Sequence, residues 1–436
     1  MKKIIYVLPL LLILTGCGKE MVPDKDSLPS GTTLTENSCE APSARIFEDI
    51  GTCDPVYTAD LQVTEEMYKK AFVNEGCRYR LARVLEKAAS GTPVTLAYIG
   101  GSITDGDSAS PKDSACYAYL TTQWWRDCFP DTTITYINAG IGATDSYIGV
   151  HRAADDVLSK APDLVVVEYS VNDTNNINRE TYESLLRNLL ESENDPAVIS
   201  LELGTKWGGF ADKHALLAFH YGIPIVSYQA LLANSMISWE DVGSSDGVHP
   251  ANPGHALIAN LLTEYYSETL EDLRLMEKGE APVHAAADCY DEEALPTDSI
   301  TACSYRNPDL LYSSDVTADN AEGFAPAQDG PWILNGKGWS TSSGGNICFT
   351  IDASCIGIAY LQWKTAPVNG AASMDVYIDD EYITTVNSFN PESWGNHLEY
   401  AECLKTDTPG RHRLELRLTG YSADQCFELL GICVTK

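Results

Sequence analysis

The fold of this chain is decided by the stretch Val94-Thr-Leu-Ala-Tyr-Ile-Gly-Gly-Ser-Ile-Thr-Asp-Gly-Asp107. Its first half is a short apolar run rich in β-forming residues, which predicts a buried strand over 94–99. Gly100 and Gly101 then allow the backbone to turn sharply. Ser102 follows at the carboxyl end of the strand, where open α/β sheets bind their ligands. A serine in a glycine turn is also common without any function, so this stretch alone does not assign one.

The same alternation of strand and helix extends to both sides of this stretch. A helical pattern over 64–89 precedes it and ends at Ser90-Gly91. Further strands are predicted at 133–138, 164–169, 197–201 and 223–227, with helices at 114–129, 147–159, 179–191, 212–221 and 253–270. The alternation predicts a parallel sheet with helices on both faces, occupying residues 61–270.

The pattern changes after residue 270. Residues 271–330 are acidic and interrupted by proline and glycine, which predicts a connector. Residues 331–436 carry only strand patterns, at 346–351, 356–363, 373–378, 382–386, 411–418 and 427–434. Short strands separated by turn signals predict an all-β sandwich or jelly-roll domain.

Tryptophans of this second domain are candidates for stacking on sugar rings. Trp339 and Trp394 lie in segments rich in glycine, serine and asparagine, where either sugar contact or packing is open, and Trp332 joins them as a candidate. Trp363 lies inside an apolar strand and is expected in the core. We therefore expect the domain to dock on, or to shape access to, the glycan that carries the ester.

Composition and charge exclude one class of partner. The chain has 62 acidic and 29 basic residues, a formal net charge of -33. Such a chain repels phosphate backbones, so nucleic acid is not expected as a partner.

The N-terminus has the pattern of an export signal. Met1-Lys2-Lys3 is positively charged, and the apolar run from Ile4 to Leu14 is too short to span a bilayer comfortably. Leu14-Thr15-Gly16-Cys17 resembles the bacterial lipoprotein box, which implies cleavage before Cys17 and lipidation of that cysteine. We therefore expect residues 1–16 to be a signal peptide and 17–60 a tether and entry loop, with the protein held on the outer face of a bacterial membrane.

Cysteines permit disulfides in an exported protein. Cys17 apart, 12 of the 13 cysteines remain. Cys39 with Cys53 and Cys289 with Cys303 are plausible local pairs, whereas Cys116, Cys348 and Cys433 lie inside predicted elements and are expected to be buried thiols. The sequence has no cysteine and histidine spacing typical of zinc sites.

Three more polar stretches lie near the ends of predicted elements. They are Asn138-Ala-Gly-Ile-Gly-Ala143, Tyr169-Ser-Val-Asn172-Asp173 and Ser245-Asp246-Gly-Val-His249-Pro. Taken singly, each is typical of a turn, a helix cap or a loop. Together with Gly100-Gly101-Ser102, and in this order, they resemble the sequence blocks of the SGNH hydrolases, or GDSL-like esterases, over about residues 94–260.

This resemblance implies a three-layer, flavodoxin-like α/β fold and a serine esterase site. It implies Ser102, Asp246 and His249 as catalytic residues, and an oxyanion hole formed by Ser102, Gly142 and Asn172. Gly101 departs from the aspartate of the Gly-Asp-Ser form, a variant that also occurs in carbohydrate esterases of the superfamily. Ala143 stands near the usual glycine of the second block, so either Gly142 or Ala143 could supply the loop donor.

The residue types independently suit ester cleavage, which needs a nucleophile, a base, a group that orients the base and donors for the oxyanion. Among the 8 histidines, His249 follows an aspartate by three residues in a loop. Asp246 could hold one ring nitrogen and leave the other for Ser102, while the Asn172 amide donates at any pH. His214, His220 and His255 lie in predicted helices and are expected to be structural.

We therefore interpret the chain as a membrane-anchored serine esterase that hydrolyses acetyl or other short acyl esters carried by carbohydrate. The expected chemistry needs no metal or organic cofactor. Asp105, Asp107 and Asp173 could suggest a cation site, but in so acidic a chain they are interpreted as solvated loop residues. Two alternatives are an acyltransferase with the same triad and a non-catalytic glycan-binding lipoprotein. The intact Ser102, Asp246, His249 and Asn172 argue against the second.

Overall fold

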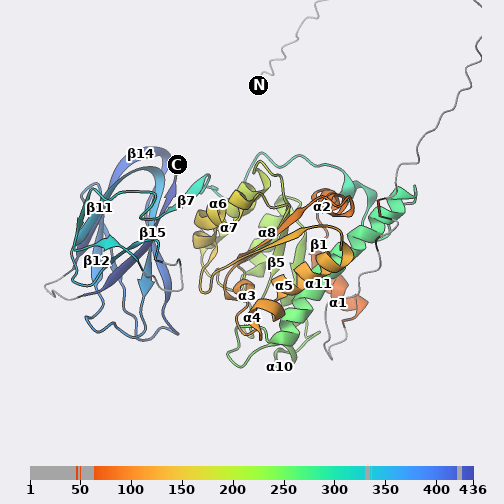
Figure 1. The fold of residues 1–436 in the computed structure, drawn as a ribbon, viewed down its shortest axis with the longest axis horizontal. Coiled ribbons are helices and arrows are strands. Elements are labelled where there is room, and N and C mark those ends of the chain that lie inside the picture. The colour runs from red at the N-terminus through yellow and green to blue at the C-terminus, as the bar shows by residue number, and fades with distance from the viewer. Residues whose placement is uncertain (1–45, 48–49, 51–62, 329–333, 335, 420–424) are drawn as a thin grey trace, which may run out of the picture. The chain divides into compact units, whose positions relative to one another are not determined.

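The computed structural model describes residues 46–47, 50, 63–328, 334, 336–419 and 425–436. They form an α/β part followed by an antiparallel β part (Figure 1), which confirms the predicted fold class. Both parts belong to one compact unit, Arg45–Lys436. The predicted signal peptide, Cys17 and the Cys39–Cys53 pair lie outside the described residues. Among the helices that are described, none is long and apolar enough to cross a membrane.

The α/β sheet has the strand order β1-β6-β5-β4-β2-β3. Its parallel strands are β2 (Val94–Gly100), β3 (Ile134–Gly140), β4 (Leu164–Glu168), β5 (Ala197–Glu202) and β6 (Ile225–Ser227). β2 pairs with β3 on one side and with β4 on the other. Because the chain order reverses between β2 and β4, the crevice at their carboxyl ends is where such a sheet binds ligands.

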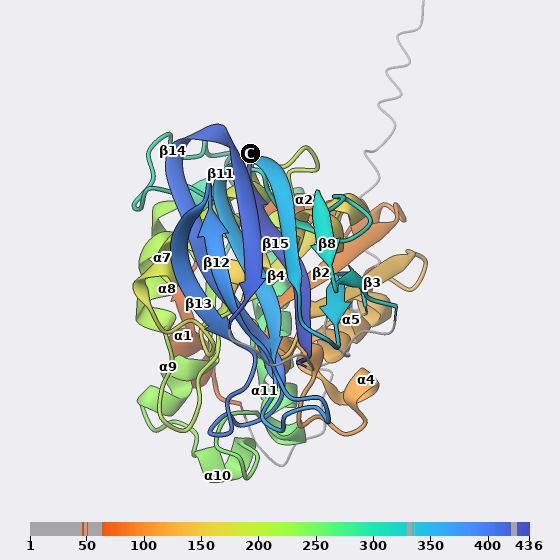
Figure 2. The same cartoon turned by 90° about the vertical axis from the view of Figure 1, so that its left-hand side faces the viewer.

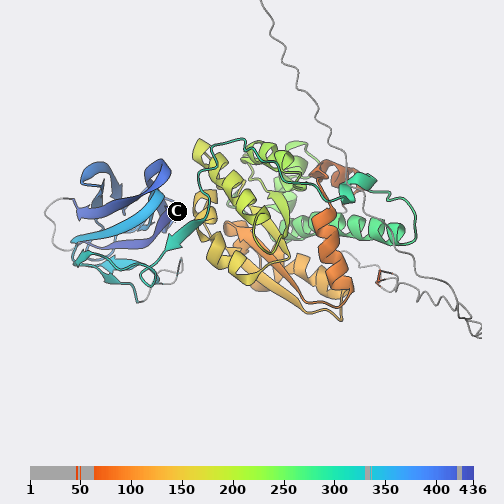
Figure 3. The same cartoon turned by 90° about the horizontal axis from the view of Figure 1, so that it is seen from above.

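Helices cover both faces of this sheet. One set is α2 (Tyr79–Ala89), α5 (Tyr117–Cys128) and α11 (Asn252–Glu277), the long green helix of Figures 1 and 3. The other set is α6 (Ser146–Asp156), α7 (Asn176–Leu190) and α8 (Ala211–His220). Along β2, Leu96 and Tyr98 pack in the apolar cluster that contains the first set of helices. Ala97 and Ile99 pack in the cluster that contains the second set. A strand buried on both faces must be apolar almost throughout, as this one is.

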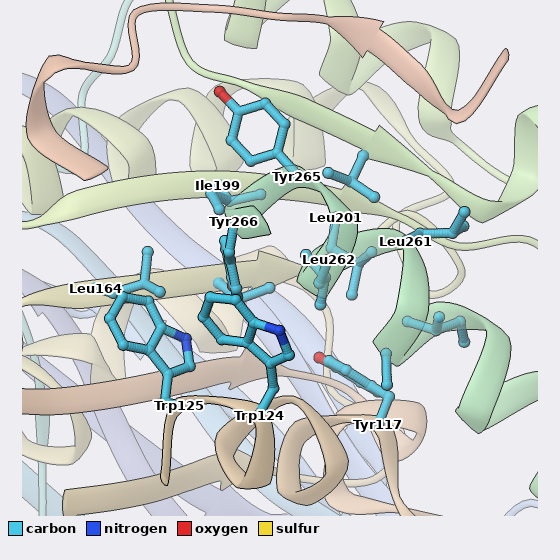
Figure 4. Close-up of a cluster of buried hydrophobic side chains, with 14 of the residues drawn as sticks. Tyr117, Trp124, Trp125, Leu164, Ile199, Leu201, Leu261, Leu262, Tyr265 and Tyr266 are labelled. Atoms are coloured by element: carbon cyan, nitrogen blue, oxygen red, sulfur yellow. The ribbon is translucent and has the colours of Figure 1, made fainter. Parts of the chain in front are cut away.

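The core between α5, α11 and the sheet is aromatic (Figure 4). Trp124 and Trp125 of α5 are fully enclosed, and their ring centroids lie 5.6 and 5.5 Å from that of Tyr266 on α11. Leu164 and Ile199 belong to the same cluster and come from the sheet. This packing holds α11 against the sheet and so fixes the loop that immediately precedes it.

The β part is a single antiparallel sheet (Figure 2). Its strands are β10 (Trp339–Thr341), β11 (Asn346–Gln362), β12 (Ser373–Ile378), β13 (Glu381–Asn387), β14 (His397–Leu418) and β15 (Phe427–Thr435). β11 pairs with β14 along nearly its whole length. The segment 271–330 adds β7 (Pro308–Leu311), β8 (Asn320–Glu322) and β9 (Ala325–Pro326) to this sheet.

Some local predictions are wrong. The helix predicted over 64–89 is divided into α1 (Glu65–Ala71) and α2 by β1 (Phe72–Asn74), which pairs antiparallel with β6. The free edge of the sheet offers backbone partners that local helical spacing does not reveal. The helix predicted over 114–129 is likewise divided at Cys116, which is extended, into α4 (Lys112–Ala115) and α5. Short helices α9 (Tyr228–Ala233) and α10 (Trp239–Val242) were not predicted.

Burial decides the roles of several cysteines and tryptophans. Cys289 and Cys303 are free, so their predicted pairing is wrong. Trp339 is 3% exposed and its ring lies 4.8 Å from that of Phe349, so it is a core residue and no sugar platform. The core position predicted for Trp363 is confirmed, and Trp394 is 68% exposed. The described structure does not include Trp332.

Candidate active site

Ser102 lies at the carboxyl end of β2, where the sheet reverses its order. It begins the short helix α3 (Ser102–Asp105) directly after Gly101. The turn is closed by the Asp105 N–H, which donates to the Gly101 carbonyl at 3.0 Å. The side chain of Ser102 is mostly enclosed, and the residue lines an open cleft of about 970 Å³. The sheet topology therefore presents this serine at the ligand-binding edge, as predicted.

The end of β3 supports this turn by close contact. A Cβ on Gly140 would lie 2.1 Å from the backbone nitrogen of Asp105, so only glycine allows β3 to approach α3. Asn138 adds a hydrogen bond from its Nδ2 to the Thr104 carbonyl at 2.8 Å. The turn that carries Ser102 is thus fixed by the neighbouring strand.

Asn172, in the loop after β4, lies against Gly101. A Cβ on residue 101 would be 3.2 Å from Asn172 Nδ2, a tight contact. The glycine that replaces the more usual aspartate therefore leaves room for this amide beside Ser102. Gly142 and Ala143 line the same cleft. All the residues predicted for the oxyanion hole thus gather at one edge of the sheet.

Asp246, His249 and Ser102 form a continuous hydrogen-bonded chain. Asp246 Oδ2 lies 2.7 Å from His249 Nδ1, and His249 Nε2 lies 2.8 Å from Ser102 Oγ. The other Asp246 oxygen accepts the backbone N–H groups of Val248 and His249 at 2.7 and 3.0 Å. With Nδ1 facing a carboxylate, that nitrogen carries the proton and Nε2 is left to accept the Ser102 hydroxyl.

The hydrogen bonds that Asp246 accepts keep its carboxyl ionised. Burial raises the pKa of the Asp246 carboxyl, but hydrogen bonds from the His249 ring and from backbone N–H groups outweigh this and hold the pKa well below its usual value. A permanent negative charge next to Nδ1 favours the protonated imidazole. This arrangement can withdraw a proton from Ser102 Oγ and stabilise the resulting imidazolium.

Two buried charged groups beneath the site were not found from the sequence. Arg152 on α6 donates to the Gly100 carbonyl at 3.0 Å and to Tyr169 Oη at 2.9 Å. Glu168, the last residue of β4, accepts the Thr104 hydroxyl at 3.1 Å. Burial raises the pKa of Glu168 to about 7, against hydrogen bonds from Thr104 and the Gly101 backbone. A glutamate ending an otherwise apolar strand was the available signal in the sequence.

Asp173 is also more important than predicted. The sequence interpretation made it a solvated loop residue, but it is 2% exposed. Its carboxyl accepts the Ser146 N–H at 2.8 Å and lies 2.8 Å from His214 Nε2. His214 is buried and stacks on Tyr182 at 3.6 Å, which agrees with the structural role expected for it.

The remaining acidic residues near Ser102 are ion-paired. Lys112 Nζ lies 2.6 Å from Asp105 and 2.9 Å from Asp107. His255 is buried, with its Nδ1 accepting the Tyr117 N–H at 3.2 Å, as expected of a structural histidine. Within the described ranges, no group of three or more acidic, histidine or cysteine residues could hold a metal ion.

Glu168→Gln should make stability depend less on pH. An unfolded glutamate titrates near about pH 4.3, whereas the folded carboxyl titrates at about 7. Between these values the folded protein binds the extra proton, so Glu168 lowers the free energy of unfolding as the pH rises. Glutamine does not titrate, so the variant lacks this loss. The free energy of unfolding of the variant, compared with that of the parent at the same pH, should therefore increase by up to about 3 kcal/mol from acid to neutral pH. Urea unfolding at several pH values measures the difference; a constant difference would refute the shifted pKa.

The chain is similar to a known protein family and to solved esterase structures. Residues 98–257 match the GDSL-like Lipase/Acylhydrolase family. No curated protein matches the chain. Two solved structures of a two-domain esterase active on acetylated mannans, one co-crystallised with mannopentaose, are each 29% identical to it, with TM-scores of 0.73 and 0.72. Both alignments cover 85% of this chain and 98% of the other, so they extend beyond the α/β part. Residues 98–257 thus resemble a GDSL-like acylhydrolase domain, the α/β part has the SGNH-type fold, and the chain is a carboxylic ester hydrolase.

Proposed function

We propose that this enzyme removes acetyl or other short acyl groups from carbohydrate, with Ser102 as nucleophile, His249 as base and Asp246 orienting the base. The observation that carries the proposal is the hydrogen-bonded chain from Asp246 through His249 to Ser102 Oγ, with distances of 2.7 and 2.8 Å. Both distances are within the range needed for general-base activation of a serine.

Acylation follows from this arrangement. Ser102 Oγ attacks the ester carbonyl carbon while His249 Nε2 accepts its proton, and the carbonyl oxygen becomes an oxyanion. The intermediate collapses, the bond to the sugar oxygen breaks, and that oxygen takes the proton from His249. A water molecule, deprotonated by His249, then attacks the acyl-Ser102 ester, the bond from the acyl carbon to Ser102 Oγ breaks, and Oγ takes the proton back from His249 as the acid leaves. Asp246 remains ionised throughout and stabilises the imidazolium.

The oxyanion would be stabilised by three donors. These are the Ser102 N–H, the N–H of Gly142 or Ala143, and the Asn172 side-chain amide. All four residues line the cleft that contains Ser102 Oγ. Donors held before the reaction starts are effective because they do not need to reorganise as charge develops.

A carbohydrate substrate is supported by the lining of the cleft and by the similar esterases. Acidic side chains such as Asp105 and Glu399 line it together with the exposed Trp394. Carboxylates accept hydrogen bonds from sugar hydroxyls, and an indole ring offers a flat apolar surface. Because the similar two-domain esterase acts on acetylated mannans, acetylated mannan is the first polymer that we propose as substrate.

Ser102→Ala and His249→Ala should each abolish most activity. In serine hydrolases such losses reach about a million-fold in kcat and are not additive. Hydrolysis of p-nitrophenyl acetate measures the effect, and circular dichroism checks that the variants fold. Ser90→Ala, an exposed serine after α2, is the matched control and should keep full activity. Substantial activity in Ser102→Ala would refute the assignment of the nucleophile.

Trp394→Ala should weaken action on polymer and spare a small ester. Trp394 is 68% exposed, lines the cleft and stacks on His397 at 5.5 Å. Loss of one aromatic surface is expected to raise KM for acetylated mannan roughly 3- to 10-fold. Acetate release from mannan and p-nitrophenyl acetate hydrolysis are compared, with the exposed Tyr382 of β13 changed to alanine as a control. Equal effects on both substrates would contradict a role in sugar binding.

We also propose that Cys17 is lipidated and anchors the enzyme to the outer face of a bacterial membrane. The support is the sequence Leu14-Thr15-Gly16-Cys17 after a short apolar run. Cys17→Ser should leave the protein soluble outside the cytoplasm or as an uncleaved precursor, because the lipid chains supply the membrane affinity. Membrane fractionation and mass spectrometry of the mature N-terminus measure this. An unmodified Cys17 in the membrane fraction would contradict the anchor.

A further inference from the structure

A tyrosine of the β part contacts the loop that carries the proposed oxyanion donor. Tyr400, on β14, donates from its Oη to Asp145 Oδ2 at 2.8 Å. Its ring also stacks on Tyr147 of α6, with centroids 4.2 Å apart and planes 8° from parallel. A Cβ on Gly357 of β11 would lie 2.1 Å from Tyr147 Oη, so this glycine permits the close approach of β11 to α6.

Asp145 is the N-cap of α6 and uses both carboxylate oxygens. Oδ1 accepts the backbone N–H groups of Tyr147 and Ile148 at 3.1 and 3.3 Å. Oδ2 accepts Asn178 Nδ2 at 2.7 Å as well as the Tyr400 hydroxyl. The β part thus supplies one of the donors that fix this carboxylate.

The loop before Asp145 needs such a fixed end. Ala143 has a φ of 61°, in the left-handed region that is unfavourable for residues other than glycine. The turn is closed from within by Thr144, whose hydroxyl donates to the Ile141 carbonyl at 2.7 Å. A strained turn keeps its geometry only when its surroundings hold it. The hydrogen bonds that fix Asp145 therefore also help to hold Gly142 and Ala143 in position.

The same helix end is tied to the second oxyanion loop. Ser146, the first residue of α6, donates its N–H to Asp173 Oδ1 at 2.8 Å, and Asp173 directly follows Asn172. The loop with Gly142 and the loop with Asn172 therefore meet at the start of α6. A shift of this helix end would move both sets of donors.

We propose that Tyr400 is a positioning residue for ester hydrolysis, because its hydrogen bond to Asp145 fixes the loop that carries the oxyanion donor. The β part then serves the chemical step itself, in addition to any contact with polymer. This inference rests on the proposed triad and oxyanion hole. It differs from glycan docking because it applies equally to a substrate without sugar.

The charge state of Asp145 offers a specific readout. Burial, and after it the nearby Asp173, raise the pKa of Asp145 to about 7, against the hydrogen bonds from Tyr400 and Asn178, which lower it. The buried Cys433 of β15 also interacts with this carboxyl, and Asp173 in turn contacts His214. Removing the Tyr400 hydroxyl removes a donor that favours the ionised form, so the pKa of Asp145 should rise.

The decisive variant is Tyr400→Phe, which keeps the stacked ring and removes only the donor. With p-nitrophenyl acetate, which has no sugar to contact Tyr400, kcat should fall about 10-fold with little change in KM. The acidic limb of the kcat profile should move to higher pH, because Asp145 protonates earlier. If Tyr400 contributed to stability alone, Tyr400→Phe would show neither a fall in kcat at nearly constant KM nor a shift of the acidic limb of the kcat profile.

Two control variants separate this effect from general loosening. Lys405→Ala removes the ion pair of β14 with Glu180 of α7, 2.5 Å long, without touching Asp145. Tyr360→Phe alters a tyrosine that stacks on Phe427 within the β part. Both should keep the kcat and pH profile of the parent, and thermal melts confirm that all variants are folded at the assay temperature.

The outcomes are distinguishable. If Tyr400→Phe leaves kcat and its pH profile unchanged, or if Lys405→Ala lowers kcat equally, the positioning role is wrong. In both cases an inactive Ser102→Ala would leave the proposed function intact. If Ser102→Ala retains activity, the proposed function fails first, and the positioning role fails with it.

Discussion

The pairing of β2 with both β3 and β4 is the constraint on which the site depends. Because the strands are parallel, their carboxyl ends meet at one edge, and the reversal of order leaves a crevice there. Ser102 and Asn172 follow two paired strands and are therefore neighbours. Gly140 then allows β3 to approach α3 more closely than any side chain would permit, and Gly101 leaves the Asn172 amide room that a side chain would narrow.

Buried carboxylates hold this edge in position. Glu168 and Asp173 lie beneath the loops that they fix, and each accepts hydrogen bonds from groups near the reacting serine. Burying a charge is unfavourable, and the raised pKa of Glu168 records that conflict. Such groups are retained where they fix geometry, and fixed donors are what stabilise a developing oxyanion. The stability of this region and the chemistry of the site are therefore linked.

The β part is packed against the α/β part through a shared apolar cluster. Tyr147 and Val157 of the α/β part belong to the same cluster as Leu361 and Leu398 of the β strands. A continuous core couples two regions more tightly than a flexible connector would. The contact between Tyr400 and Asp145 gives this coupling a route to the reacting groups.

The sequence by itself determined the class of fold and the residues of the hydrogen-bonded chain. Strand and helix periods are local, and Ser102, Asp246, His249 and Asn172 lie in short motifs whose spacing is visible in one dimension. Only the tertiary structure decided the roles of Glu168, Asp173, Asp145 and Tyr400, and the core position of Trp339. Their roles depend on burial and on partners far away in the chain, as with Tyr400 and Asp145, 255 positions apart. A carboxylate looks the same in the sequence whether it is solvated or enclosed, because only packing decides which donors surround it.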